Sequence, residues 1–227
     1  MTTEPSNTPQ AKSHRLPLML LAVVALAAGS TVGWLLQGDR LQKRSPVELQ
    51  SGTSLLAHAR PMPAFALVDH NGDPFDNDRL KGKWTFLFFG YTHCPDICPT
   101  TLSTLNQVTQ LLENDDAGEN TQVVFVSVDP DRDSPENLAG YVVYFNPDFV
   151  GVTGEAQALA QLTSSLGILH AKVEDPSNPD NYLVDHSGSI LLAGPAGELA
   201  AVFSAPHDPA ALATDLRTLH GAYGQQY

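Results

Sequence analysis

The chain has 227 residues, of which 42% are hydrophobic and 16% are charged, and it contains only two cysteines. This length allows a short N-terminal segment and one domain of average size, and the hydrophobic content is typical of a packed domain rather than a disordered chain. From residue 45 onward there are 23 acidic and 7 basic residues. Such a body repels the phosphate backbone of nucleic acids, so nucleic-acid binding is disfavoured.

The first predicted element is a membrane segment at residues 16–37, which are 22 residues without a charge. A bilayer core requires about 20 such residues. Two interpretations compete: a retained anchor, or a cleavable signal with an A-x-A site at Ala25 and Ala27. Apolar character resumes at residues 32–36, which favours the anchor. Basic residues flank both ends, so they do not set its orientation.

Residues 38–60 are mixed in character and are predicted to be a linker between the membrane segment and the body. Residues 63–76 alternate in polarity around Asn71-Gly72, which is a hairpin signal. The run WTFLFFG at 84–90 is apolar throughout, as in a strand that is buried on both faces. This strand leads directly to the two cysteines.

The remaining elements are predicted from apolar periodicity, capping residues and turns. They are a helix from Pro99 to Leu112, a strand at 122–128, a helix opened by Ser134-Pro135, a helix at 154–167, two strands at 189–194 and 198–204 joined by a turn, and a helix at 208–221 ended by Gly221. This order predicts an α/β fold, thioredoxin-like, with a central mixed sheet flanked by helices and preceded by one transmembrane helix. The folded domain is placed at residues 61–223, with a C-terminal tail at 224–227.

The two cysteines, Cys94 and Cys98, follow the buried strand and begin the next helix. Backbone N–H groups and the helix dipole at such a position favour thiolate over thiol. A disulfide between residues four apart on a helix is possible only with some adjustment. The spacing is wider than in the common dithiol redox motif, and it also suits two thiolates that converge on one metal ion.

Two histidines could complete a metal site with these sulfurs. His93 adjoins the first cysteine, but its alternative role is to lower the pKa of that thiol. His186 is predicted on a loop before the last hairpin, and in a thioredoxin-like fold that loop packs beside the cysteines. Thiolate and imidazole together suit copper, whereas a structural zinc site would need four protein ligands. The residues alone leave both histidines open.

The segments FFGYTHCPDICP, VSVDPDRDSPENLAGYV, FVGVTGEAQALAQL and YLVDHSGSILL occur in this order. On the basis of these segments, most of residues 62–220 resembles the Sco/SenC family of membrane-anchored copper proteins that assist cytochrome c oxidase assembly. The resemblance implies a thioredoxin-like fold and copper bound by Cys94, Cys98 and His186, with His93 as a motif neighbour. One departure is the turn at residues 193–198, AGPAGE, where relatives often have Asp-Pro; only the turn should differ.

The resemblance also implies a location. The N-terminal residues 1–15 would be cytoplasmic and the body would lie in the periplasm. No Arg- and Ser-rich presequence is evident, so a bacterial inner membrane is expected.

The function implied is that of a copper metallochaperone, which carries Cu(I) or Cu(II) to the binuclear copper site of the oxidase's copper-bearing subunit. Other periplasmic copper chaperones or thiol reductants are further expected partners. The alternative is a thiol-disulfide reductase that keeps the subunit's cysteines reduced, with Cys94 attacking and Cys98 resolving. A thiol peroxidase shares the fold, but nothing in the sequence specifies a site activated for peroxide.

Overall fold

The structure of the chain is a computed structural model that describes residues 47–55, 58–174 and 182–224. The predicted membrane segment at residues 16–37 and the N-terminal residues 1–15 lie outside the described residues. Within the described ranges, no helix combines the length and the apolar character that a membrane crossing requires.

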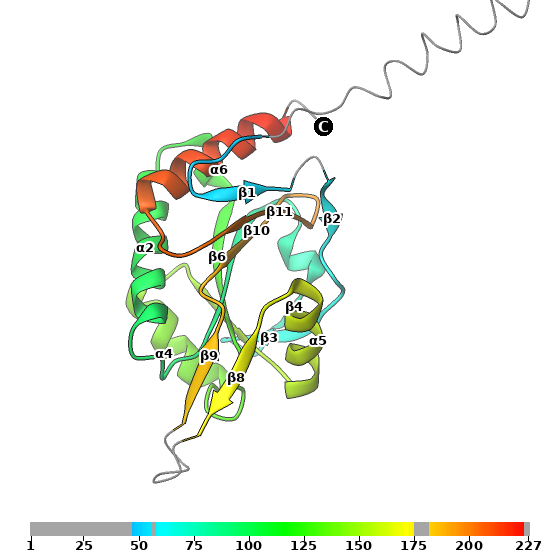
Figure 1. The fold of residues 1–227 in the computed structure, drawn as a ribbon, viewed down its shortest axis with the longest axis vertical. Helices are drawn as coiled ribbons and strands as arrows, with labels where there is room; N and C mark the ends of the chain where they lie inside the picture. Colours follow the sequence, from blue (N-terminus) through cyan, green and yellow to red (C-terminus); the bar gives the residue numbers. More distant parts are fainter. Residues whose placement is uncertain (1–46, 56–57, 175–181, 225–227) are drawn as a thin grey trace, which may run out of the picture. The chain divides into compact units, whose positions relative to one another are not determined.

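A mixed sheet forms the centre of the body (Figure 1). In the described residues it has nine strands in the order β1-β11-β10-β5-β6-β7-β3-β4, with β2 paired to β11. Strands β5, β6 and β7 are parallel to one another, and the other pairs are antiparallel. The strands are β1 Gly52–Ser54, β2 Arg60–Pro61, β3 Ala66–Asp69, β4 Pro74–Asp76, β5 Trp84–Gly90, β6 Thr121–Ser127, β7 Val150–Thr153, β10 Ile190–Ala193 and β11 Glu198–Phe203.

Helices cover both faces of this sheet, as the sequence predicts. Buried leucines of α2, α4 and α6 pack in one core cluster, and those of α5 and the 3-10 helix η3 pack in a second cluster on the opposite face. Figure 1 shows α2, α4 and α6 on one side of the sheet and α5 on the other. The helices are η3 Asn77–Leu80, α2 Ile97–Leu111, α3 Asp116–Glu119, α4 Pro135–Phe145, α5 Ala156–Leu166 and α6 Pro209–Gly224.

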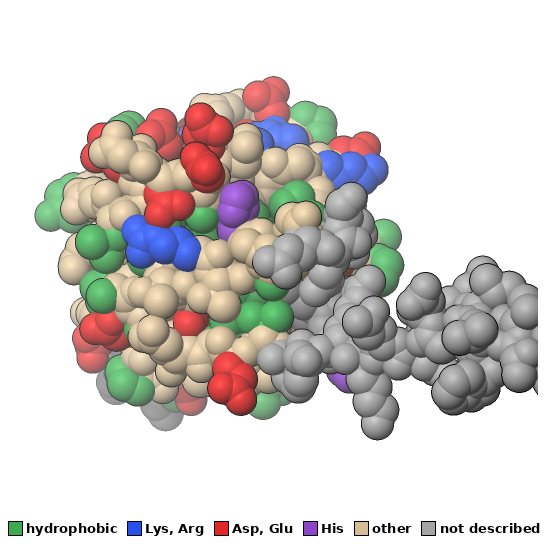
Figure 2. Space-filling model, turned by 90° about the horizontal axis from the view of Figure 1, so that it is seen from above, with side chains coloured by type: hydrophobic (Ala, Val, Ile, Leu, Met, Phe, Trp, Pro, Cys, Tyr) green, Lys and Arg blue, Asp and Glu red, His purple; other side chains and the backbone are tan. Residues whose placement is uncertain are grey.

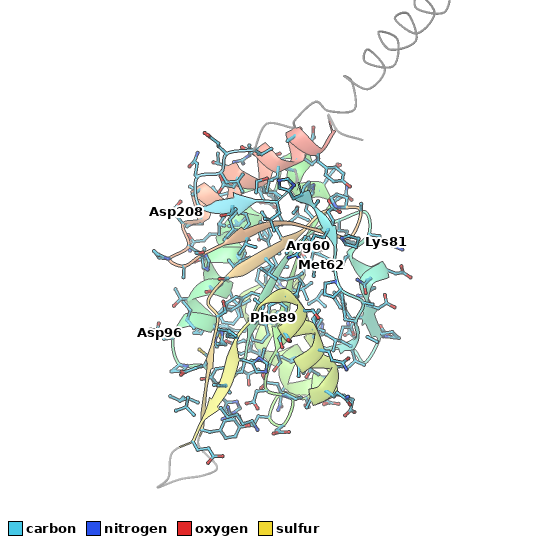
Figure 3. All side chains as sticks on the ribbon, turned by 45° about the vertical axis from the view of Figure 1, so that its right-hand side comes forward. Arg60, Met62, Lys81, Phe89, Asp96 and Asp208 are labelled. Carbon is cyan, nitrogen blue, oxygen red and sulfur yellow. The ribbon has the colours of Figure 1, made fainter. Side chains whose placement is uncertain are left out.

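Strand β5 divides the two core clusters because its side chains alternate between the faces of the sheet. Phe86 and Phe88 belong to the cluster beneath α2, whereas Leu87 and Phe89 belong to the cluster beneath α5. Figure 3 shows Phe89 inside the body and Asp96, just before α2, at its surface. All seven residues of β5 are buried, which confirms the two-sided burial predicted from its continuous apolar run.

Several elements differ from the sequence prediction. Strand β7 was not predicted, because only four residues pair and one of them is Gly151. A separate two-stranded sheet, β8 His170–Val173 with β9 Leu183–His186, was not predicted either, because most of its side chains are exposed and it lacks an apolar alternation. Helix α6 continues to Gly224 instead of ending at Gly221.

The described part of the predicted linker is attached to the body. Strands β1 and β2 pair with β11, and a Cβ on Gly52 would lie only 2.3 Å from the Phe203 ring, so glycine permits this close approach. Two backbone N–H groups just before β1 donate to the buried Asp215 of α6, Gln50 N at 2.6 Å and Ser51 N at 2.8 Å. The Ser51 hydroxyl donates a third, at 2.6 Å. The packed body therefore begins well before residue 61.

The Asp215 anchor leads to a stability prediction. Asp215→Ala removes the acceptor of three hydrogen bonds and leaves their donors only partly exposed. We expect the free energy of unfolding to fall by about 1–3 kcal/mol, measured by urea unfolding of the full-length protein in detergent. The exposed Asp73→Ala variant is the control and should match the wild type. Equal stability of both variants would contradict the anchoring role of Asp215.

Candidate metal centre

The two cysteines lie where β5 gives way to α2. Cys94 is in the turn between these elements, with its backbone N–H donating to Tyr91 O at 3.2 Å. Cys98 is in the first turn of α2 and points into the core, where it is fully buried. A Cβ on Gly90 would lie 2.5 Å from Cys98 Sγ, so the last residue of β5 has to be glycine to leave space for the sulfur. The sequence prediction did not identify this role of Gly90.

His186 reaches the cysteines from the far part of the sequence. It is the last residue of β9, where it pairs with His170 of β8, and not part of a loop as predicted. Its imidazole packs edge-on against two rings of the β5 region, Phe88 at 6.0 Å and Tyr91 at 5.8 Å between ring centroids. These rings restrict the orientation of the imidazole toward the cysteines.

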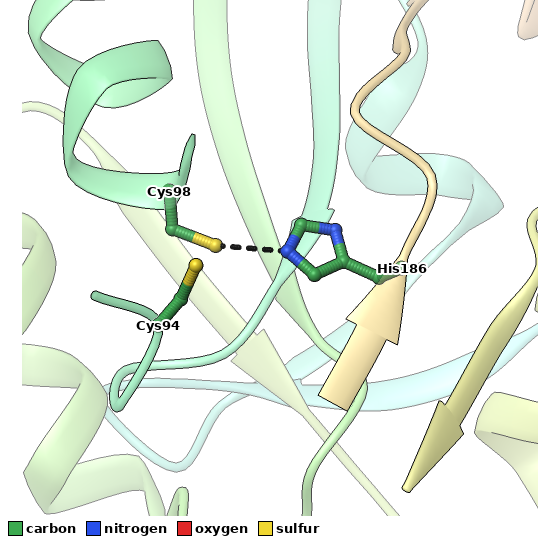
Figure 4. A group of neighbouring side chains, drawn as sticks. All are labelled: Cys94, Cys98 and His186. Carbon is green, nitrogen blue, oxygen red and sulfur yellow. Dashed lines mark hydrogen bonds between the residues drawn. The ribbon is translucent and has the colours of Figure 1, made fainter. Parts of the chain in front are cut away.

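The structure brings the three predicted site residues together (Figure 4). One ligand atom from each of Cys94, Cys98 and His186 lies within 4.8 Å of the other two, and among the described residues this is the one such group that could hold a metal ion. The Cys98 Sγ to His186 Nε2 distance is 3.2 Å. His93 is exposed and outside the group, and its Nδ1 lies 3.0 Å from Thr92 Oγ1.

The imidazole presents its lone pair to the sulfurs. His186 Nδ1 lies 3.1 Å from the Ser187 carbonyl oxygen. A carbonyl can only accept, so Nδ1 carries the proton, and Nε2 is the unprotonated nitrogen. The Cys98 thiol then donates to Nε2. A metal-binding histidine is commonly held by such a hydrogen bond on its other nitrogen, and the sequence gives no sign of it because the acceptor belongs to the backbone.

Burial controls the protonation of the site. It raises the pKa of the Cys98 thiol well above its usual range, and a backbone hydrogen bond at Tyr91 offsets only part of this effect. The expected preference for thiolate at the helix start does not hold for Cys98, because burial disfavours the charged form of its sulfur. Burial also lowers the pKa of His186, which keeps the imidazole neutral. Before a metal binds, the site holds a protonated Cys98 thiol and a neutral histidine.

Most of the basic side chains of the body are paired with carboxylates. Figure 2 shows acidic side chains spread over one face of the body, with basic side chains beside some of them. Five of the seven basic residues after residue 45, all within the described residues, form ion pairs with carboxylates: Arg79, Lys81, Arg132, Lys172 and Arg217.

The chain is similar in sequence to known proteins. A model of the SCO1/SenC family matches residues 54–221. A protein of Stutzerimonas stutzeri that is named for copper binding is 40% identical over 157 residues, which are 69% of this chain and 76% of the relative.

Two solved structures are also similar. The structure of Arabidopsis thaliana ScoI with copper bound has a TM-score of 0.66 and 32% identity, covering 71% of this chain and 99% of that one. The structure of Bradyrhizobium japonicum ScoI with copper bound has a TM-score of 0.63 and 34% identity, covering 70% of this chain and 98% of that one.

Proposed function

The chain belongs to the SCO1/SenC family, and from this premise we propose that it is a membrane-anchored copper metallochaperone. It holds one copper ion between Cys94, Cys98 and His186 and delivers it to the binuclear copper site of a cytochrome c oxidase subunit. The observation that carries this proposal is the meeting of the three ligand atoms within 4.8 Å of one another.

The donor set fits copper. Thiolates are soft ligands that favour Cu(I), and imidazole binds copper in either common oxidation state. A structural zinc site is typically closed by four protein ligands, and this group has three. Three ligands also leave one side of a bound ion open, as a carrier requires.

The residues of the site have distinct parts in loading and release. Loading displaces the thiol proton of Cys98 to solvent, while the Ser187 carbonyl keeps Nδ1 of His186 protonated and Nε2 free for the ion. Cys98 is buried and Cys94 is half-buried, so an acceptor thiolate reaches the ion from the Cys94 side. Release then proceeds by exchange of one sulfur for another, with His186 and Cys98 holding the ion until the acceptor is bound.

Copper affinity should depend on pH, because each ligand proton that is displaced weakens binding at lower pH. The raised pKa of Cys98 means that this thiol is protonated at neutral pH and loses one proton on binding. The lowered pKa of His186 means that the imidazole is already neutral and loses none. We expect the apparent affinity to rise at least about tenfold per pH unit between about pH 6.5 and 8, measured by competition with a copper chelator of known pH dependence. A flat profile would contradict a protonated Cys98.

Copper stoichiometry tests the proposal directly. The reduced full-length protein in detergent should bind one copper ion per chain, with an absorption band from the copper-thiolate bond. Cys94→Ser and Cys98→Ser should each lose this tight site. If either variant keeps one tightly bound ion with an unchanged spectrum, the three-residue site is not the copper site.

A thiol-disulfide reductase is the second candidate, and the unequal exposure of the two free cysteines supports it. The half-buried Cys94 would attack a substrate disulfide and form a mixed disulfide with it. The buried Cys98 would then displace the substrate as a dithiol and leave a Cys94–Cys98 disulfide. A thiol reductant would have to restore the pair, so this activity requires a second partner.

We further propose that residues 16–37 anchor the chain in a bacterial inner membrane with the body in the periplasm. The uncharged length of this segment supports the anchor. With the body in the periplasm, copper donors and acceptors of that compartment could reach the site. Protease added to intact spheroplasts should digest the body and leave only a fragment at the N-terminus. Full protection of the body would contradict this orientation.

A further inference from the structure

The metal centre has a cysteine half, Cys94 with Cys98, and a histidine half, His186. Cys98 and His186 are 88 positions apart, and a third segment contacts both halves. Residues 128–134, here called the linking loop, connect β6 to α4. The loop contains two fully buried carboxylates, Asp129 and Asp133, and neither belongs to the group of metal-ligating atoms. Asp133 forms hydrogen bonds toward the cysteines, and Asp129 forms them toward the strand of His186.

Asp133 contacts the cysteine half. Its Oδ2 accepts from Thr92 N at 3.0 Å and from Ser127 Oγ at 2.6 Å, and its Oδ1 accepts from Thr92 Oγ1 at 2.6 Å. Thr92 lies two residues before Cys94, whose own N–H donates to Tyr91 O. Asp133 therefore fixes the backbone that leads into the first cysteine.

Asp129 contacts the histidine half through Tyr182, the residue before β9. The Tyr182 hydroxyl donates to Asp129 Oδ1 at 2.6 Å. Arg132 pairs with Asp129, donates to the Tyr182 carbonyl at 2.9 Å and stacks 3.6 Å from the Tyr182 ring centroid. Three contacts from the linking loop therefore hold Tyr182, which directly precedes the strand that ends in His186.

The two halves also meet directly through Tyr91. The Tyr91 ring is in edge contact with His186. The Arg132 guanidinium lies 5.5 Å from the same ring. Arg132 therefore touches one aromatic ring from each half of the centre.

Buried carboxylates are expensive to desolvate, so a buried polar network of this kind serves more to specify one geometry than to add stability. We propose that the linking loop positions the metal ligands. Asp133 with Thr92 sets the Cys94 backbone, and Asp129 with Tyr182 sets the His186 strand. This inference rests on the proposed copper site, and its residues are positioning residues rather than ligands.

Tyr182→Phe tests the histidine half, because it removes one hydroxyl and keeps the ring that Arg132 stacks on. Loss of a contact that orients a metal ligand typically weakens metal binding about 10–100-fold, so we expect at least a tenfold loss of copper affinity. In a His186→Ala background the same change should have no further effect, since its only route to the metal is the histidine. The exposed Tyr144→Phe is the matched control and should behave as wild type.

Thr92→Val tests the cysteine half. It removes the hydroxyl that donates to Asp133, and it should weaken copper binding about tenfold both with and without His186. It should also shift the reduction potential of the Cys94–Cys98 pair, which Tyr182→Phe should leave unchanged. The two variants therefore differ in which readout they change. Should Tyr182→Phe fail to fold, the Thr92→Val result decides the inference for the cysteine half.

A readout without copper separates this inference from the proposed function. Hydrogen exchange of the β9 amides in the metal-free full-length protein should be faster in Tyr182→Phe than in wild type and unchanged in Tyr144→Phe. Wild-type affinity in Tyr182→Phe, or an equal loss in the His186→Ala background, would overturn the positioning role. Failure of the wild type to bind copper would overturn the proposed function instead, and the exchange rates would still report on the loop.

Discussion

Replacing His186 with alanine is expected to weaken copper binding by more than about a hundredfold, a larger loss than the 10–100-fold typical of residues that only orient a ligand. The reason is that the substitution removes one of three ligand atoms in the group. Thiol-disulfide exchange should stay near the wild-type rate, because the attacking sulfur of Cys94 and the α2 start are unchanged. Copper affinity by chelator competition and the rate of reduction of a model disulfide are the two measurements.

His93→Ala is the matched control for this experiment. His93 is adjacent to Cys94 but exposed and outside the ligand group, so copper affinity should be retained. Equal losses of copper binding and dithiol exchange in His186→Ala would contradict the separation of the two activities. A loss of tight binding in His93→Ala would show that His93 contributes to the site, which would contradict the ligand group proposed here.

Gly90→Ala is expected to disturb both the fold and the site. The added Cβ would lie 2.5 Å from Cys98 Sγ and 2.8 Å from the Phe125 ring, and all three residues are buried. Overpacking of this kind costs about 1–3 kcal/mol of folding free energy. Since the sulfur must move away from the new methyl group, copper affinity should fall as well. Urea unfolding and chelator competition measure the two effects.

Gly140→Ala provides a control of opposite sign. Gly140 is an exposed residue of α4 with no atom within 4 Å of its added Cβ. Alanine in a helix interior is more stable than glycine by about 0.5–1 kcal/mol, so this variant should gain stability and keep its copper affinity. A Gly90→Ala variant as stable as wild type and with unchanged copper affinity would show that the core around Cys98 is looser than its packing indicates.

The parts of the fold that the sequence predicts are those in which apolar residues form an unbroken run or recur with helical spacing. Strand β5 matches its prediction at both ends because every residue from Trp84 to Gly90 is buried. The β8–β9 sheet escaped prediction because its strands are short and mostly exposed, and nine residues separate Val173 from its partner Leu183, so no tight-turn signal joins the strands. The identity of His186 as a candidate ligand could therefore be predicted, but the strand that carries it could not.

The chemistry of the site was predicted less completely than its residues. The protonated state of Cys98 depends on how Gly90 and Phe125 pack around the sulfur, which spacing along the chain does not reveal. The linking loop is visible in the sequence as an acidic motif, VSVDPDRD. Its partners Thr92 and Tyr182 are 41 and 53 positions away from the carboxylates that they contact, and only the folded structure pairs them.

The unequal depth of the two sulfurs has a consequence for damage by peroxide. Cys94 is the more accessible thiol, so it is the one that is oxidised first, to a sulfenic acid. Cys98 Sγ lies within 4.8 Å of it and can condense with that sulfenic acid, releasing water and forming a disulfide. A disulfide is reversible, whereas further oxidation to sulfinic or sulfonic acid is not. The buried sulfur thus gives the more accessible one a repairable end state.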